Sequence, residues 1–346
     1  MRFLFLKYKL SYQHSNNIIY NHMKKIILII LALTISPNII KAQEGIPIYH
    51  DYLSDNLYLL HPSMAGASSC AKVRLTARMQ WFDIADNPML QTFSFHTHLG
   101  EEGQNGIGVI IFNDRNGYHS QKGLQLAYAH HINFGNGADV NKLSFGLAGT
   151  LVQNQLDETS FDPNRFDPII AGVVQSEMYY NIDVGMSYHY KGFFFNATLK
   201  NALLASRDLY TSFEPVNLRN YVGSMGIYAG NGSVFFEPSI LIQYKEFSGQ
   251  IITDGNLKFY FNLKDDNMVY IGGSYRTDWE PDANLNYFKT ITPILGARIK
   301  KFTIAYTYTY DMSVTPINNS GFHQLTLGYN FNCRKQLVRM GCPEIF

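Results

Sequence analysis

The amino-acid sequence predicts an all-β fold, a transmembrane β-barrel of about 14 antiparallel strands in an outer membrane. Three observations predict it: apolar and polar residues alternate along many segments, charged residues are few, and short and long connections follow one another between the segments. Charged residues make up 16% of the chain, against about 25% in typical soluble domains. With 46% hydrophobic residues and a formal charge of +1, the chain does not belong to the disordered class.

The alternation has a period of two over about ten residues, which is the pattern of a strand with two different faces. In the clearest segment, Phe302, Ile304 and Tyr306 share one face, and Thr303 and Thr307 share the other. A large apolar face suits lipid, and a small or polar face suits a barrel lumen. Strands are expected at 73–82, 90–99, 105–113, 120–134, 141–155, 178–190, 193–202, 219–230, 234–244, 250–263, 268–276, 287–298, 302–310 and 323–331.

The connections between these segments predict the orientation of the barrel. Connections after even-numbered strands are tight, at 191–192, 231–233, 264–267 and 300–301. Connections after odd-numbered strands are longer, at 156–177, 203–218, 277–286 and 311–322. Outer-membrane barrels have short periplasmic turns and long extracellular loops. A soluble β-sandwich, the alternative fold, would need more Lys and Glu on its second face than these strands carry.

The first 42 residues have the pattern of an N-terminal extension that ends in a secretory signal peptide. Met23, Lys24 and Lys25 precede the apolar run Ile26–Ile40, as a basic n-region precedes an h-region. Without residues 1–42 the chain has 22 basic and 27 acidic residues, a formal charge of −5. A nucleic-acid partner is therefore not expected, because phosphate binding needs a basic surface.

Three regions are expected after this extension. Residues 43–72 form an apolar segment that either folds into the lumen as a partial plug or packs across the periplasmic mouth. Residues 73–331 form the barrel, and residues 332–346 form a tail in the periplasm.

Several residues are candidates for binding partners. Two long loops carry aromatic residues among carboxylates, and the tail carries three basic residues. The candidates are Phe161, Phe166, Trp279, Arg334, Lys335 and Arg339. Trp279 could be an interface anchor or part of the aromatic belt of the membrane.

Three cysteines lie at the expected periplasmic end, which is an oxidising compartment. A disulfide between Cys333 and Cys342 would close a short loop around the basic residues of the tail. The alternative pairings would join Cys70 to the tail instead.

The sequence contains no pattern that predicts catalysis, so a non-enzymatic protein is expected. His96 and His98 share a strand face but have no Cys or carboxylate at ligand spacing, so they indicate lumen polarity and no metal site. There is no nucleophile elbow and no phosphate-binding glycine loop. No catalytic residue and no cofactor is therefore expected.

Short motifs near the N-terminus carry a resemblance to a known family. They are Tyr52-Leu53, Asn56-Leu57, His61-Pro62-Ser63-Met64-Ala65-Gly66, Arg78-Met79-Gln80-Trp81, Asn87-Pro88 and Gln91-Thr92-Phe93-Ser94. Together with Gly106-Ile107-Gly108, Tyr128-Ala129-His130, the strand Leu143-Ser144-Phe145-Gly146-Leu147 and the terminal Cys-Pro-x-x-Phe, they resemble the PorP/SprF family of type IX secretion system membrane proteins. His61 stands where the family usually has Asn, and Ser63 where it usually has Ala.

The resemblance implies a Bacteroidota-type outer membrane and a role in protein secretion and gliding motility. The implied partners are outer-membrane lipid, a large secreted surface protein (cargo or adhesin) and the periplasmic lipoprotein ring of the secretion system. The alternative function is a porin-type passive channel, which would have an open lumen with rings of charge. An outer-membrane hydrolase is a third hypothesis.

Overall fold

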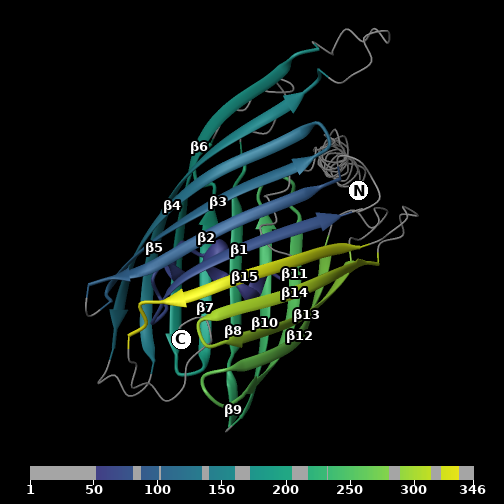
Figure 1. The fold of residues 1–346 in the computed structure, drawn as a ribbon. Coiled ribbons are helices and arrows are strands. Elements are labelled where there is room, and N and C mark those ends of the chain that lie inside the picture. The colour runs from purple at the N-terminus through teal and green to yellow at the C-terminus, as the bar shows by residue number, and fades with distance from the viewer. Residues whose placement is uncertain are drawn as a thin grey trace, which may run out of the picture. The chain divides into compact units, whose positions relative to one another are not determined.

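The computed structural model describes residues 52–80, 87–100, 103–134, 140–159, 172–204, 217–231, 233–279, 289–312 and 321–334. The strands form one antiparallel sheet that closes on itself as a 14-stranded barrel (Figure 1). Strand numbers run to 15 because one strand is interrupted at Tyr228 and carries two labels, β8 and β9, in a single register against β10. The predicted fold class is confirmed.

The strands agree with the expected segments to within a few residues. The largest difference is at β6, which begins four residues before the expected start. The strands are β1 (Ala71–Gln80), β2 (Met89–Leu99), β3 (Asn105–Asn116), β4 (His119–Asn133), β5 (Asn141–Asp157), β6 (Val174–Tyr190), β7 (Phe193–Lys200), β8 (Asn220–Ile227), β9 (Ala229–Asn231), β10 (Val234–Lys245), β11 (Ile251–Asn262), β12 (Met268–Trp279), β13 (Lys289–Ile299), β14 (Phe302–Asp311) and β15 (Phe322–Phe331).

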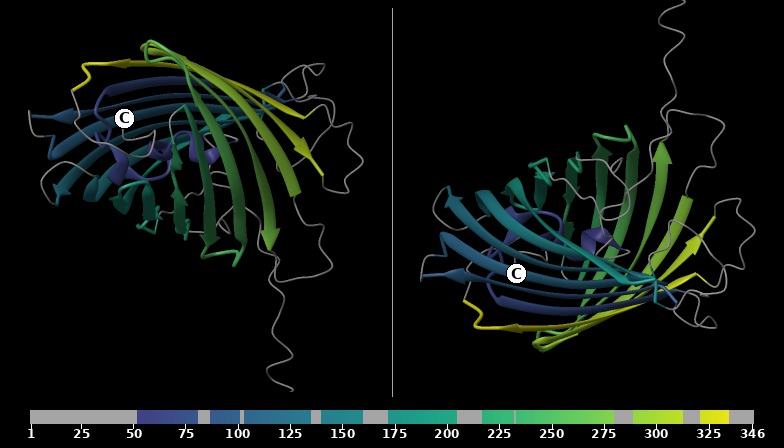
Figure 2. Two further views of the ribbon diagram at one scale, coloured as in Figure 1. Left: turned by 90° about the horizontal axis from the view of Figure 1, so that it is seen from below. Right: turned by 90° about the horizontal axis from the view of Figure 1, so that it is seen from above.

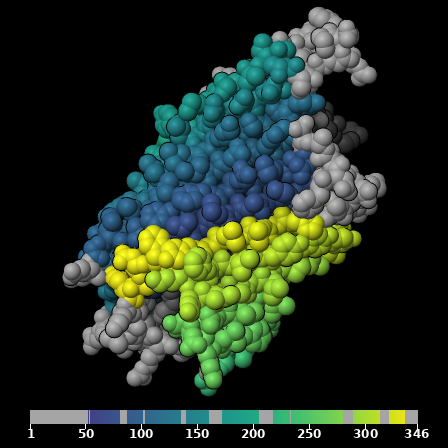
Figure 3. Space-filling model, in the orientation of Figure 1, coloured from purple at the N-terminus to yellow at the C-terminus, as the bar shows by residue number. Residues whose placement is uncertain are grey.

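The first and last strands close the barrel. β1 pairs with β15 along its whole length, from Ala71 opposite Phe331 to Gln80 opposite Phe322. Figure 3 shows the side chains of these two strands in contact on the outer surface. Because the barrel is closed, the backbone N–H and C=O groups of both strands have hydrogen-bond partners. Hydrocarbon offers these groups none, so a membrane-spanning sheet needs such pairing.

The two faces of each strand differ as the alternation predicts. Leu126, Leu147 and Phe302 point outward and are 59%, 53% and 65% exposed, as lipid-facing residues of an isolated chain should be. Thr303 and Thr307 point inward and are buried. No helix in the described part of the chain combines the length and the apolar character needed to cross a membrane.

The two ends of the barrel also differ as predicted. Where β1 begins and β15 ends, the connections are short, for example Lys191-Gly192 between β6 and β7. The connections at the opposite end are mostly long, so this end is extracellular. There are two exceptions: the β3–β4 hairpin, which turns through Gly117 and Tyr118 alone, and the short connection 246–250 between β10 and β11.

The segment that precedes β1 lies inside the barrel. It contains three short 3₁₀ helices, η1 (Leu53–Asp55), η2 (Leu57–Leu59) and η3 (Pro62–Met64). Each residue from 54 to 72 is buried. Both views of Figure 2 show this purple segment enclosed by the strands. We call residues 52–70 the plug.

We expect Tyr306→Arg to destabilise the barrel by about 2–4 kcal/mol, because Tyr306 is outward-facing in the middle of β14, where a cation would meet hydrocarbon. Denaturant titration of the protein folded into lipid vesicles measures this change. Tyr306→Phe is the control: it loses only the hydrogen bond to His323 and should stay within about 1 kcal/mol of wild type. Equal effects of the two substitutions would contradict the assignment of this face to lipid.

Candidate functional site

The plug crosses the lumen, and its first half is bound to β11 and β12. The ammonium group of Lys258 lies 3.0 Å from a carboxylate oxygen of Asp55, and both side chains are buried. The same ammonium group lies 4.9 Å from the ring centroid of Tyr52, whose hydroxyl donates to the carbonyl of Gly273. Breaking a buried ion pair by removing one partner costs about 3–5 kcal/mol, so this contact fixes where the plug begins.

The middle of the plug is bound to β6, β7 and β8. The His61 ring spans two strands, because Nδ1 lies 2.9 Å from Thr198 Oγ1 and Nε2 lies 3.0 Å from Ser224 Oγ. Ser63 Oγ lies 2.6 Å from Ser187 Oγ. Burial, with Lys200 and His189 nearby, lowers the pKa of His61 to about 3, so the ring is neutral near pH 7.

The last part of the plug is bound to β2, β4 and β5. His131 donates from Nε2 to the Ala65 carbonyl at 2.9 Å, so its Nδ1 accepts from the hydroxyl of Ser144. Lys142 donates to the Ala67 carbonyl at 3.0 Å. The N–H of Gly66 donates to His96 Nδ1. With the contact from Asn56 to Ser94, the plug makes hydrogen bonds to eight strands.

Two glycines in the wall allow the plug to approach this closely. A Cβ at Gly106 would overlap the carbonyl of Ala65, and a Cβ at Gly146 would overlap the backbone of Ser63. Any other residue at either position would therefore push the plug away from β3 and β5. Sequence analysis singled out Gly106 and Gly146 only as parts of family motifs, and it missed Lys142 and Lys258 as contacts of the plug. The sequence pattern that could have identified the two lysines was their position on strand faces predicted to point into the lumen, where charged residues are few.

His96 and His98 both face the lumen, as predicted, and both are buried. In the described residues no group of three or more His, Cys, Asp or Glu side chains could hold a metal ion.

The disulfide differs from the pairing proposed first. Cys70 is bonded to Cys333. The predicted bond between Cys333 and Cys342 is therefore wrong, and one of the alternative pairings, which join Cys70 to the tail, is correct. The physical reason is closure: Ala71 pairs with Phe331, which brings the residues just outside both strands together. The N–H of Arg334 donates to the Ser69 carbonyl and extends this contact.

The structure describes two of the predicted partner-binding residues, Trp279 and Arg334, and does not bring them together. Trp279 ends β12 at the extracellular end, points outward and is 59% exposed. Arg334 lies at the periplasmic end, where its guanidinium packs against Gly103. The two are therefore at opposite ends of the barrel. The other candidates lie outside the described residues: Phe161, Phe166, Lys335, Arg339 and the cysteine Cys342.

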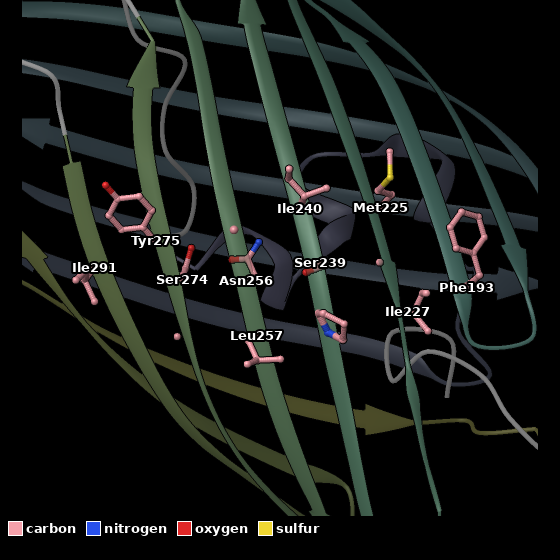
Figure 4. Close-up of a pocket in the computed structure, with 14 residues that line it drawn as sticks. Phe193, Met225, Ile227, Ser239, Ile240, Asn256, Leu257, Ser274, Tyr275 and Ile291 are labelled. Atoms are coloured by element: carbon pink, nitrogen blue, oxygen red, sulfur yellow. The ribbon is translucent and has the colours of Figure 1, made fainter.

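The outer wall has an apolar groove of about 660 Å³ over β8, β10, β11 and β12 (Figure 4). Met225, Ile240, Leu257 and Tyr275 border it. Gly255 and Gly273 also line it, and a Cβ at either would meet no atom within 4 Å. The groove belongs to the lipid-facing surface, and Gly273 is the one residue that it shares with the plug contacts named above.

A closed antiparallel barrel with an apolar outer face and long loops at one end is an outer-membrane protein. The family model "Type IX secretion system membrane protein PorP/SprF" matches residues 41–329, and the chain belongs to this family. No curated protein sequence matches it significantly.

Solved outer-membrane barrels resemble the fold at low sequence identity. The CymD monoaromatic hydrocarbon channel is 9% identical with a TM-score of 0.43, and the match covers 79% of this chain and 92% of CymD. CdiB from Acinetobacter baumannii is 8% identical with a TM-score of 0.42, and the match covers 76% of this chain and 60% of CdiB. The chain thus spans less than two thirds of the length of CdiB.

We expect attachment of the plug to weaken at acidic pH. Free His61 keeps its ordinary pKa of about 6.5, so between pH 6.5 and about 3 the released plug binds more protons than the bound one. Attachment is therefore full above pH 6.5 and weaker by about 2 kcal/mol at pH 5. Hydrogen exchange of residues 57–67, corrected for the intrinsic exchange rate at each pH, measures this loss of attachment. His61→Gln cannot titrate and should show a smaller loss of protection; the same loss in both proteins would contradict a role for His61.

We expect a non-reducing digest to contain a peptide that joins Cys70 to Cys333, because the closing strand pair places these residues together. Cys342 should react with a maleimide without prior reduction, since the other two cysteines are bonded to each other. The Cys342→Ser variant should keep the cross-link, and Cys70→Ser should lose it. Recovery of a Cys333–Cys342 peptide from the wild-type protein would contradict the structure.

Proposed function

We propose that this chain is a non-enzymatic, partner-binding barrel of the type IX secretion system. In this proposal it supports the export or surface anchoring of large secreted proteins and contacts the periplasmic ring of the machinery. Its family membership supports a place in that system. The plug supports the choice of partner binding over passive transport.

The plug carries this argument. A porin needs a continuous aqueous path, whereas here residues 52–70 cross the lumen and hydrogen-bond to strands on opposite walls, from β2 to β11 and β12. The bonds to β2 and β11 are buried, the bond to β12 is partly buried, and the bond to β11 is an ion pair. A plug attached to the wall by these contacts suits a barrel whose partners bind at its two ends.

The two ends offer different surfaces. At the extracellular end, Trp279 is exposed at the end of β12. β5 ends and β6 begins on the same side, and Phe161 and Phe166 lie between these two strands in the sequence. We propose that these aromatic residues anchor the secreted protein, since buried aromatic anchors dominate protein interfaces. We propose that Lys335 and Arg339 contact the periplasmic ring. We do not include Arg334 in this contact, because its guanidinium packs against Gly103 of the barrel.

We expect the purified protein to show no large conductance in planar bilayers. We also expect a tagged chain to retain type IX secretion proteins when it is isolated from outer membranes of its host. Asp55→Ala removes the carboxylate that pairs with Lys258 and should raise conductance by loosening the plug. Porin-like conductance of the wild-type protein, with no secretion component retained, would favour the channel alternative.

The Lys335→Ala, Arg339→Ala double variant tests the periplasmic contact separately. We expect normal barrel levels in the outer membrane but reduced retention of ring components and reduced surface display of cargo. Lys289→Ala is the matched control, because it removes a cation at the extracellular end. Unchanged retention and display in the double variant would exclude the tail as a docking element.

A further inference from the structure

A polar pocket of about 520 Å³ lies on the outer wall at the extracellular ends of β3, β4 and β5. Its lining includes Asn113, Arg115, Tyr118, Ser120, Lys122 and Gln155. Closer to the barrel middle, by one step on β3 and β4 and by two on β5, the same strand faces carry Ile111, Leu124 and Leu151, all exposed apolar residues. The pocket therefore lies where the apolar band of the wall ends, at the level of lipid headgroups.

Two cations face the same way in this pocket. Lys122 lies opposite Asn113, and Arg115 lies opposite Ser120, so Arg115 and Lys122 are diagonal neighbours on one face of the β3–β4 hairpin. Diagonal neighbours are about 7–8 Å apart, which long side chains bridge easily. Both residues are exposed. Guanidinium and ammonium groups on one face are donors suited to a phosphate.

The pocket also contains one carboxylate. Asp157 lines its edge, and its Oδ1 accepts hydrogen bonds from the N–H and the hydroxyl of Thr159. Together with Arg115 and Lys122 it leaves the lining with a formal charge of +1. This charge suits a single phosphate group better than a pyrophosphate.

The rest of the lining suits a sugar. The hairpin turns through only Gly117 and Tyr118, so this hairpin has no long loop to cover the pocket. The Tyr118 ring is 49% exposed. Asn113 donates to Gln91 Oε1, and Gln155 provides a second amide. Amides and an exposed aromatic ring are suited to sugar hydroxyls and to the face of a sugar ring.

We propose that this pocket binds the headgroup of a phosphorylated glycolipid from the outer leaflet of the membrane. Arg115 and Lys122 bind the phosphate, Asn113 and Gln155 bind sugar hydroxyls, and Tyr118 packs against the sugar ring. The acyl chains lie below, on the apolar faces of β3, β4 and β5. A phosphorylated glycolipid has a phosphate, a sugar and acyl chains in this arrangement. Inorganic phosphate and soluble sugar phosphates lack the acyl chains.

Native mass spectrometry of the full-length protein in detergent, titrated with monophosphorylated lipid A, tests the proposal. The Arg115→Gln, Lys122→Gln double variant should bind at least tenfold more weakly, and dephosphorylated lipid A should bind wild type equally weakly. Asp157→Asn should bind severalfold more tightly, because it removes the negative charge and keeps the acceptor for Thr159. Lys289→Gln, which alters a cation at the extracellular end of another strand, should bind like wild type.

Several outcomes would overturn the proposal. These are equal binding by wild type and the double variant, equal binding of lipid A and its dephosphorylated form, or equally tight binding of phosphatidylglycerol. Displacement of lipid A by an equal concentration of inorganic phosphate would assign the pocket to free phosphate instead. A folding defect in the double variant leaves the test intact, because the expected gain in Asp157→Asn cannot arise from misfolding.

Discussion

The structure depends on one constraint: hydrocarbon offers no hydrogen-bond partner to the backbone, so the sheet must close on itself. Closure pairs β1 with β15, strands that are separated by most of the chain. Both ends of the barrel sequence therefore lie at the same periplasmic mouth. The Cys70–Cys333 disulfide and the contact from Arg334 to Ser69 follow from this pairing, and the plug enters the lumen beside them.

Closure also creates a polar interior that needs partners. Inward faces carry hydroxyls, amides and charges such as Lys142 and Lys258, and burying these groups without hydrogen bonds is costly. The plug supplies the partners, including the Asp55 carboxylate and the carbonyls of Ala65 and Ala67. The lumen and the plug are therefore complementary, and this complementarity is the physical basis for proposing a barrel that binds partners at its ends.

The two departures from the family pattern in the plug lie within this network. His61 stands where the resemblance implies Asn, and it uses both ring nitrogens to join β7 and β8. An Asn amide also offers a donor and an acceptor, so the replacement preserves hydrogen-bonding capacity while reaching farther. Ser63, where Ala is usual, adds a bond to Ser187 on β6. His61 and Ser63 together join the plug to the three neighbouring strands β6, β7 and β8.

Periodicity and connection length in the sequence were sufficient for the strands, their two faces and the orientation of the barrel, because lipid and lumen impose different side chains on alternate positions. The tertiary structure alone decided the location of the plug and its polar contacts. It also decided the pairing of Cys70 with Cys333 and the grouping of Arg115 with Lys122. The reason is that these contacts join residues far apart in the chain or on neighbouring strands, and they depend on strand register and closure.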